Sequence, residues 1–333
     1  MGSLFMKHWT HYWGTSGALN SFAEGEANQG YANSVKQFWE SILAELPTDA
    51  TVLDVGCGNG AIAALAVQYS QANNKQFNVE GADAAAIDPT KNVPANHPLS
   101  SALKQVRFHS EMPVEELAHA NDSIDAIVSQ FAIEYSDLDK AIAKFSDVVK
   151  PGGVVAALVH DSTSGLLKDS KQGIAIIEDV LDNTPLFLQA DLLINLAKQA
   201  IPQLGQEKWN EFSHNRILVN AIKWTMDVLL ERYSQTQQQV WIRDIVARVA
   251  RTLDLLNQGQ VEQAQQFLNM HYHLLAEHKQ RLIDQEQAAL SAKTIQSRLI
   301  KKLEQAGFVA TADRMEVDGD KFAWAVTARK MSA

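Results

Sequence analysis

The 333-residue chain has room for one large domain or two modest ones, and its composition, 46% hydrophobic and 20% charged, is that of a globular protein. Its net charge of −10 at pH 7 argues against DNA or RNA as a partner, because an acidic surface repels a polyanion. The single cysteine, Cys57, excludes an intramolecular disulfide and a cluster of cysteine metal ligands.

The first segment, residues 1–48, lacks a signal-peptide core, and no apolar run in the chain reaches membrane-spanning length. We therefore expect a cytoplasmic protein that does not contact a membrane. Aromatic residues and glycines crowd positions 7–33, where we expect no regular structure. A helix is predicted over 32–46, because apolar residues recur there at helical spacing, and Pro47 ends it.

The stretch TVLDVGCGNG, residues 51–60, has the pattern of a strand that runs into a glycine turn. Its first half is apolar and β-prone, as a buried strand requires, and Gly56, Gly58 and Gly60 follow at alternate positions. Apolar residues then recur at helical spacing over 61–69. Strand, glycine turn and helix open a nucleotide-binding βαβ unit, in which the missing side chains let a ligand approach the backbone.

Two ligand classes fit this turn. The pattern Gly56-x-Gly58-x-x-Ala61 satisfies the dinucleotide fingerprint, so an NAD(P)-dependent oxidoreductase is an alternative. Asp54, two positions before the first glycine, distinguishes the two classes. A carboxylate near the end of the strand disfavours a pyrophosphate and suits a ligand that carries an ammonium or sulfonium group.

On Asp54, Gly56, Gly58 and Gly60, the stretch resembles the first motif of class I S-adenosylmethionine-dependent methyltransferases, an acidic residue followed by GxGxG. The resemblance implies a Rossmann-like α/β fold, with a twisted, seven-stranded, mostly parallel sheet and helices on both faces. It also implies S-adenosylmethionine as the cofactor and S-adenosyl-L-homocysteine as the product. Asp54 would then hold the amino end of the cofactor, and Gly56, Cys57 and Gly58 would lie along it.

The second strand is predicted at 76–81 and is followed closely by Asp83. Both cofactor classes use an acidic residue at the end of this strand to hold the ribose hydroxyls. We therefore assign Asp83, with its neighbour Ala84, to the cofactor-binding site. Asp88, about one helical turn later, is the rival for the same role.

Two further contacts follow from the resemblance. The third strand is predicted at 106–109, and the loop after it contacts adenine in the family. Met112 and Pro113 are our candidates for that contact, and the acidic residues of the loop stay open as alternatives. The segment before the first motif commonly closes over the cofactor, where Tyr12 and Trp13 would contact it through cation–π packing. The alternative is that these aromatic residues anchor a loop on the domain surface.

The fourth strand is predicted at 123–130 and ends in Gln130, which the resemblance assigns to the methionyl part of the cofactor. His160 follows the fifth strand, predicted at 154–159, at an edge where open α/β sheets bind ligands. An imidazole can take a proton from a hydroxyl or amine as a methyl group arrives, so His160 is our candidate base. A structural role for His160 is the alternative, because an aligned, deprotonated nucleophile needs no base. The lesser catalytic candidates are Glu134, Tyr135 and His11.

The alternation of strands and helices stops near residue 162, and 163–292 has only helical patterns. Two strands joined by a hairpin, at 309–317 and 322–328, then close the sheet. We therefore expect a methyltransferase core at 49–162 and 293–330. The insertion, 163–292, is interpreted as a helical lid over the substrate or as a partner face, and its long amphipathic helices offer a homodimer contact.

The sequence therefore predicts methyl transfer from S-adenosylmethionine to an O, N or S atom of a small-molecule acceptor. A non-catalytic cofactor-binding or assembly protein is a second alternative, beside the oxidoreductase. A nucleic-acid methyltransferase is disfavoured, because residues 129–132 lack an Asn/Asp-Pro-Pro-aromatic motif. His273 and Glu277 share a helix face, but one helix supplies too few ligands, so we expect no metal site.

Overall fold

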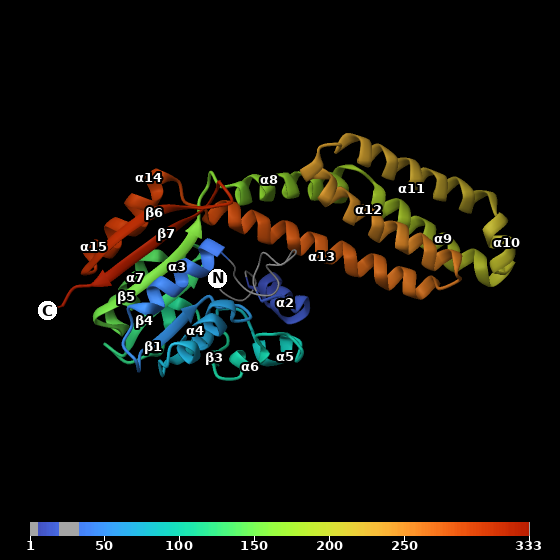
Figure 1. Ribbon diagram of the computed structural model, residues 1–333. Helices are drawn as coiled ribbons and strands as arrows, with labels where there is room; N and C mark the ends of the chain where they lie inside the picture. The colour runs from blue at the N-terminus through green and yellow to red at the C-terminus, as the bar shows by residue number, and fades with distance from the viewer. Residues whose placement is uncertain (1–5, 20–32, 333) are drawn as a thin grey trace. The chain divides into compact units, whose positions relative to one another are not determined.

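The computed structural model describes residues 6–19 and 33–332, which form two compact units (Figure 1). The α/β unit contains the described residues up to Leu167 and from Gln285 onward, and the helical unit is Lys168–Asp284. Each unit has a hydrophobic core of its own. In the described part of the chain, no helix combines the length and the apolar composition that crossing a lipid bilayer requires.

The α/β unit is built on one seven-stranded sheet with the strand order β3-β2-β1-β4-β5-β7-β6. β7 pairs antiparallel with β5 and with β6, and the other neighbouring strands are parallel. The predicted fold, a mostly parallel seven-stranded sheet, is therefore confirmed. The strands are β1 (Thr51–Val55), β2 (Asn78–Ala82), β3 (Arg107–His109), β4 (Ile124–Gln130), β5 (Val149–His160), β6 (Phe308–Val317) and β7 (Asp320–Lys330).

Helices cover both faces of this sheet, because successive side chains of a strand point to opposite faces and both sets are apolar here. In β1, Val52 joins one core with residues of α3 and α4, and Leu53 joins the other with residues of α7 and α15. The helices and helical turns of this unit are α2 (Lys7–Ser16), α3 (Asn33–Ala44), α4 (Ala61–Ala72), α5 (Pro89–Asn92), α6 (Ser100–Leu103), η2 (Val114–Glu116), η3 (Ile133–Tyr135), α7 (Leu138–Val148), α14 (Ala292–Thr294), η5 (Ile295–Ile300) and α15 (Lys301–Gln305).

The N-terminal segment is helical, so our expectation of irregular structure there is wrong for residues 7–16. The aromatic residues of this stretch recur three and four positions apart, which brings them to one face of a helix. Tyr12 and Trp13 are in edge contact there, with ring centroids 4.9 Å apart. Gly17 ends the helix at a φ of +64°, in the left-handed conformation that favours glycine. The rest of the stretch, 20–32, lies outside the described residues.

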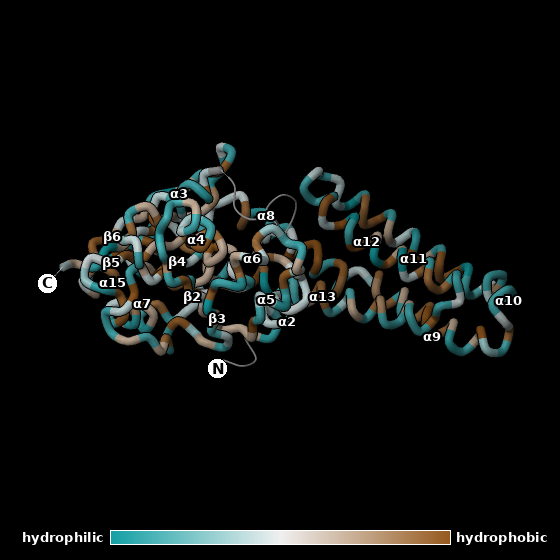
Figure 2. The backbone as a smooth tube through the Cα atoms, turned by 60° about the horizontal axis from the view of Figure 1, so that its bottom comes forward, coloured by the Kyte–Doolittle hydropathy of each residue, from teal (hydrophilic) through white to brown (hydrophobic). Residues whose placement is uncertain are grey.

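The helical unit packs amphipathic helices around an apolar core that includes Leu193, Ile222 and Leu229. In Figure 2, hydrophobic and hydrophilic residues alternate along α11 and α12, as on helices with one buried face. The insertion that we predict at 163–292 contains this unit, and its role as a lid or partner face stays a prediction. The elements from the end of β5 onward are α8 (Gly165–Glu178), η4 (Asp179–Asn183), α9 (Leu186–Leu204), α10 (Gln206–Glu211), α11 (Ser213–Arg232), α12 (Thr236–Asn257) and α13 (Val261–Ala288).

Candidate active site

The glycine turn follows β1 at the point where the strand order reverses, between β1 and β4. The backbone N–H groups of Gly56 and Cys57 donate to the Ala82 carbonyl oxygen, at 2.7 and 3.1 Å, and hold the turn against β2. Gly56 has a φ of +66°, and a Cβ atom there would lie 2.1 Å from the Ala132 Cβ. Only glycine fits this position, because Ala132 packs against it, and the approach of a ligand to this turn stays a prediction.

Asp83 ties the glycine turn to the segment after β2. Its side chain is buried, and its two carboxylate oxygens accept from Gly58 N at 2.8 Å and from Ala85 N at 2.7 Å. Burial raises the pKa of this carboxyl above its ordinary value. Each oxygen keeps a second lone pair, so the group can still accept from a ribose hydroxyl. The rival, Asp88, instead accepts from Thr90 Oγ1 and from Lys91 Nζ beside its own short helix.

Asp54 lies beneath the start of α4 and is also buried. Its Oδ2 accepts from Ala63 N at 3.1 Å. Burial and the nearby charge of Asp83 raise the pKa of Asp54 well above its ordinary value, although the bond from Ala63 opposes this. Two buried carboxylates that repel each other favour a positively charged ligand, because such a ligand lowers the cost of ionising both.

Cys57 contributes packing to the turn. Burial and the charges of Asp54 and Asp83 raise the pKa of its thiol, so the sulfur stays protonated and is a poor nucleophile. The residue belongs instead to a small buried cluster with Trp13, Ala85 and Ile87. This cluster joins α2 to the turn.

Asn59, which our sequence analysis does not single out, fastens helix α2 to the turn. Its fully buried Nδ2 donates to the Trp13 carbonyl oxygen at 3.0 Å and to the Ala18 carbonyl oxygen at 2.7 Å. The Trp13 ring lies so close to Gly58 that a Cβ atom there would come within 2.5 Å of it. A polar residue between the second and third glycines of the motif is the signal that would have drawn attention to Asn59.

A groove of about 750 Å³ runs between α2 and the loops after β2 and β3. Its lining residues include Thr10, His11, Ala84, Glu111 and Pro113. Met112 is half-buried beside this groove and donates from its backbone N–H to the Asp83 carbonyl oxygen at 2.8 Å. The structure thus brings the predicted ribose and adenine residues to one edge of the sheet, and their roles stay predictions.

Gln130 ends β4 and presents a buried donor without a partner. Trp39 Nε1 donates to Gln130 Oε1 at 2.8 Å, and since an indole nitrogen only donates, this bond fixes which way the amide lies. Gln130 Nε2 is buried and has no hydrogen-bond partner among the described residues. A buried amide without an acceptor is costly, so this atom marks a place where a ligand oxygen fits.

His160 and Glu134 form a buried pair at the end of β5. Glu134 Oε1 accepts from His160 N at 2.9 Å and lies 2.7 Å from His160 Nδ1. In a neutral imidazole that donates from Nδ1 to Glu134, Nε2 keeps its lone pair. Nε2 and Glu134 Oε2 are buried without partners among the described residues. The Phe131 and Tyr135 rings lie 4.3 and 5.8 Å from the imidazole, centroid to centroid, so the three predicted catalytic residues are neighbours.

Comparison with known proteins places this site in context. A family model described as "Methyltransferase domain" matches residues 27–209, more than half of the chain. No curated protein sequence is significantly similar to the chain.

Among solved structures, geranyl diphosphate C-methyltransferase from Streptomyces coelicolor A3(2) is 16% identical, with a TM-score of 0.34 over 47% of this chain and 65% of that one. The chain thus spans slightly less than two thirds of that protein. A geranyl diphosphate methyltransferase bound to GPP and sinefungin is 17% identical, with a TM-score of 0.35 over 47% of this chain and 67% of that one. The YcgJ protein from Bacillus subtilis is 14% identical, with a TM-score of 0.37 over 89% of this chain and 99% of that one.

Proposed function

The chain belongs to the S-adenosylmethionine-dependent methyltransferases of class I, and from this premise we propose that it methylates an O, N or S atom of a small molecule. One observation carries the proposal. Two buried carboxylates, Asp54 and Asp83, flank a glycine turn at the point where the strand order of the sheet reverses. Such a site suits a nucleoside with a cationic tail and disfavours the pyrophosphate of NAD(P).

The residues present fit S-adenosylmethionine. Asp83 offers acceptor lone pairs to ribose hydroxyls, and the turn at Gly56 and Gly58 offers backbone without side chains. Gln130 Nε2 is a donor suited to the carboxylate of the methionyl part. Asp54 carries the charge that an ammonium group requires, directly or through water.

When bound, S-adenosylmethionine supplies a methyl group on a positively charged sulfur. The acceptor atom would take this methyl group as its bond to sulfur breaks, and S-adenosylhomocysteine would be the product. We assign the proton that an O–H, N–H or S–H acceptor loses to His160 Nε2. Glu134, which lies on Nδ1, orients the ring and stabilises the imidazolium that forms. Tyr135 holds its ring edge against the imidazole and thereby limits its rotation.

Isothermal calorimetry with S-adenosylmethionine and S-adenosylhomocysteine, with NAD and NADP as controls, tests the cofactor. We expect micromolar binding of the first pair alone. Binding of a nicotinamide nucleotide alone would overturn the assignment of Asp54 and restore the oxidoreductase alternative. Methyl transfer is then measured with S-adenosylmethionine labelled in its methyl group and a panel of oxygen, nitrogen, sulfur and carbon nucleophiles. Cofactor binding without transfer to any acceptor would favour the non-catalytic alternative.

His160→Gln tests the base once an acceptor is known. We expect kcat to fall by about a hundredfold or more at neutral pH, with the KM for S-adenosylmethionine little changed. The loss should shrink at high pH, where the acceptor ionises unaided. A purely structural role for His160 would instead give a loss that does not change with pH.

The helical unit is proposed as the substrate lid or partner face. Three of its large apolar side chains, Leu188 on α9 and Ile217 and Trp224 on α11, are 69%, 65% and 69% exposed. Exposed apolar side chains of this size favour a contact surface, including one for a homodimer. Sedimentation of the chain and of Trp224→Glu would reveal a dimer that depends on this surface.

A further inference from the structure

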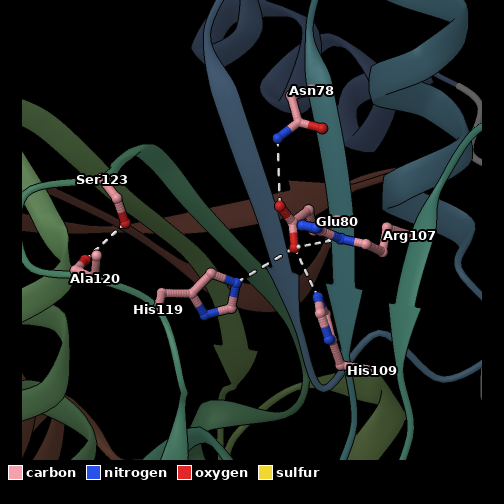
Figure 3. A network of polar contacts seen from close by, with 7 residues as sticks. All are labelled: Asn78, Glu80, Arg107, His109, His119, Ala120 and Ser123. Atoms are coloured by element: carbon pink, nitrogen blue, oxygen red, sulfur yellow. Dashed lines mark hydrogen bonds and ion pairs between the residues drawn. The ribbon is translucent and has the colours of Figure 1, made fainter.

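Three potential metal ligands that are distant in the sequence meet at the β2–β3 edge of the sheet (Figure 3). Glu80 lies on β2, His109 ends β3, and His119 belongs to the segment that follows η2. Glu80 Oε2 is 2.6 Å from His109 Nε2 and 3.4 Å from His119 Nε2. All three atoms lie within 4.8 Å of one another, so a single ion between them could touch each.

The pairing of β2 with β3 produces this convergence. Glu80 and Ala82 point to the same face of the sheet, and His109 pairs with Ala82. His109 is therefore the diagonal neighbour of Glu80 on that face. His119 approaches the same carboxylate oxygen from another direction, as Figure 3 shows.

The three side chains of this cluster are largely buried. The Glu80 side chain is 5% exposed, and those of His109 and His119 are 24% and 12% exposed. A buried carboxylate requires charge compensation, which an ion held by all three ligands supplies more completely than an exposed guanidinium 3.4 Å away. His119 Nδ1 has no partner among the described residues, so the ring is oriented mainly by the contact of Nε2 with Glu80.

We propose that Glu80 Oε2, His109 Nε2 and His119 Nε2 bind a divalent transition-metal ion with the chemistry of Zn²⁺. Two imidazoles and one carboxylate are a zinc ligand set, with a fourth position for water. Ligand bonds of about 2.0–2.1 Å in a tetrahedron separate ligand atoms by about 3.3 Å. The distance from Glu80 to His119 already matches this, and the distance from Glu80 to His109 is shorter by about 0.7 Å.

Arg107 is the group that opposes the ion. Its Nε lies 3.4 Å from Glu80 Oε2, but its side chain is 65% exposed and can turn into solvent. Removal of the guanidinium should therefore tighten the binding of the metal ion, and this substitution provides a control.

The ion would fasten the segment that leads from β3 to the groove beside α2. His109 and His119 bracket the loop that contains Met112 and Pro113, and Met112 is hydrogen-bonded to the Asp83 carbonyl oxygen. Binding at Glu80 would thus hold this loop at both ends against β2. The metal site itself does not depend on the proposed methyl transfer.

The test uses the full chain without a histidine tag, freed of metal by a chelator that is then removed. Calorimetry with Zn²⁺ and element analysis after dialysis should give one ion per chain. His119→Ala and Glu80→Gln should each weaken binding at least about tenfold, and Arg107→Gln should strengthen it. His214→Ala, which removes an exposed histidine on α11, is the matched control and should bind as the parent does.

Cobalt provides a second readout that does not rely on variants that may misfold. Co²⁺ in the parent should give the intense visible bands of a four-coordinate ion, and excess Zn²⁺ should remove them. The bands should be absent from folded Glu80→Gln. Zn²⁺ uptake that is equal in all variants, or a Co²⁺ spectrum of the free hydrated ion, would show that the cluster is only a hydrogen-bonded network.

Discussion

The α/β unit and the helical unit bury polar atoms in different ways. In the α/β unit, three side chains with unpartnered buried atoms converge where β4 and β5 end, namely Gln130, Glu134 and His160. In the helical unit, the corresponding atoms are single amide oxygens of Gln172 and Gln206, on two different helices. Unpartnered buried polar atoms cost stability, so their convergence supports the proposal that a ligand binds there.

Other buried polar side chains in the two units support this contrast. Asp54, Asn59 and Asp83 bond to the backbone of turns and of a helix start, and so shape a site. In the helical unit, Thr225 bonds to Gln189 and to its own helix, and Asn215 bonds to the Trp209 carbonyl oxygen. Polar burial there joins helices, and its apolar core supplies the stability.

Among these substitutions, Gly56→Ala should destabilise the α/β unit the most. The new Cβ meets the Ala132 Cβ at 2.1 Å, and the φ of +66° strains any other residue. We expect a loss of about 2–6 kcal/mol in the free energy of unfolding, from strain and overpacking together. Urea unfolding followed by tryptophan fluorescence measures this loss. Gly165→Ala is the control, because nothing lies within 4 Å of its Cβ position. Equal stability of the two variants would refute the close contact.

His278→Gln should alter the acid stability of the helical unit. Burial and the charges of Arg281 and Arg248 lower the pKa of His278 from its ordinary 6.5 to about 4. The unfolded chain therefore binds a proton that the folded chain excludes, and stability falls as pH drops through this window. The free energy of unfolding that this histidine costs is about 3 kcal/mol at pH 4, and this cost vanishes above pH 7.

Melting temperatures at pH 7 and pH 4.5 measure this effect. The parent should lose more stability between the two than His278→Gln does. His273→Gln replaces an exposed histidine of the same helix and should lose as much as the parent. If His278→Gln also follows the parent, the histidine is not excluded from protonation in the folded state.

Asp83→Asn distinguishes between Asp83 and Asp88 as the residue that binds the ribose hydroxyls. The amide keeps the size of the side chain but only one acceptor oxygen, so one of the two bonds from Gly58 N and Ala85 N is lost, and the melting temperature of the variant checks that it is folded. We expect S-adenosylmethionine to bind more than tenfold more weakly, which corresponds to about 1.4 kcal/mol. Asp88→Asn should bind it as the parent does, because that side chain lies beside its own helix start. Calorimetry that shows the opposite order would transfer the ribose role to Asp88.

Much of the sheet could be predicted from the sequence, because its signals are local. The apolar run that ends at Gly56 and the run over 123–130 place β1 and β4 within one or two residues of the observed strands. The glycine motif likewise locates the turn, since Gly56 needs its conformation whatever surrounds it. The hairpin between β6 and β7 follows from its turn residues, Asp318 to Asp320.

The parts that escaped prediction depend on contacts between distant residues. Glu80, His109 and His119 belong to no sequence motif, and they meet only through the pairing of β2 with β3 and the path of the segment after η2. The partners of Asn59 are Trp13 on α2 and Ala18 just after it, 46 and 41 positions away. Register and docking decide such contacts, and a local pattern carries no information about either.

Gly14→Ala has the smallest expected effect and tests the stability of α2, the helix that the sequence did not predict. Gly14 lies inside α2, and nothing is within 4 Å of its Cβ position. Alanine there should stabilise the helix by about 0.5–1 kcal/mol, because glycine loses more backbone freedom on folding. Amide hydrogen exchange over residues 7–16 should therefore slow about two- to fivefold. Gly17→Ala is the opposing control, since its φ of +64° disfavours alanine and exchange should quicken. Unchanged exchange in Gly14→Ala would mean that docking through Asn59 and Trp13, rather than helix propensity, limits how often α2 opens.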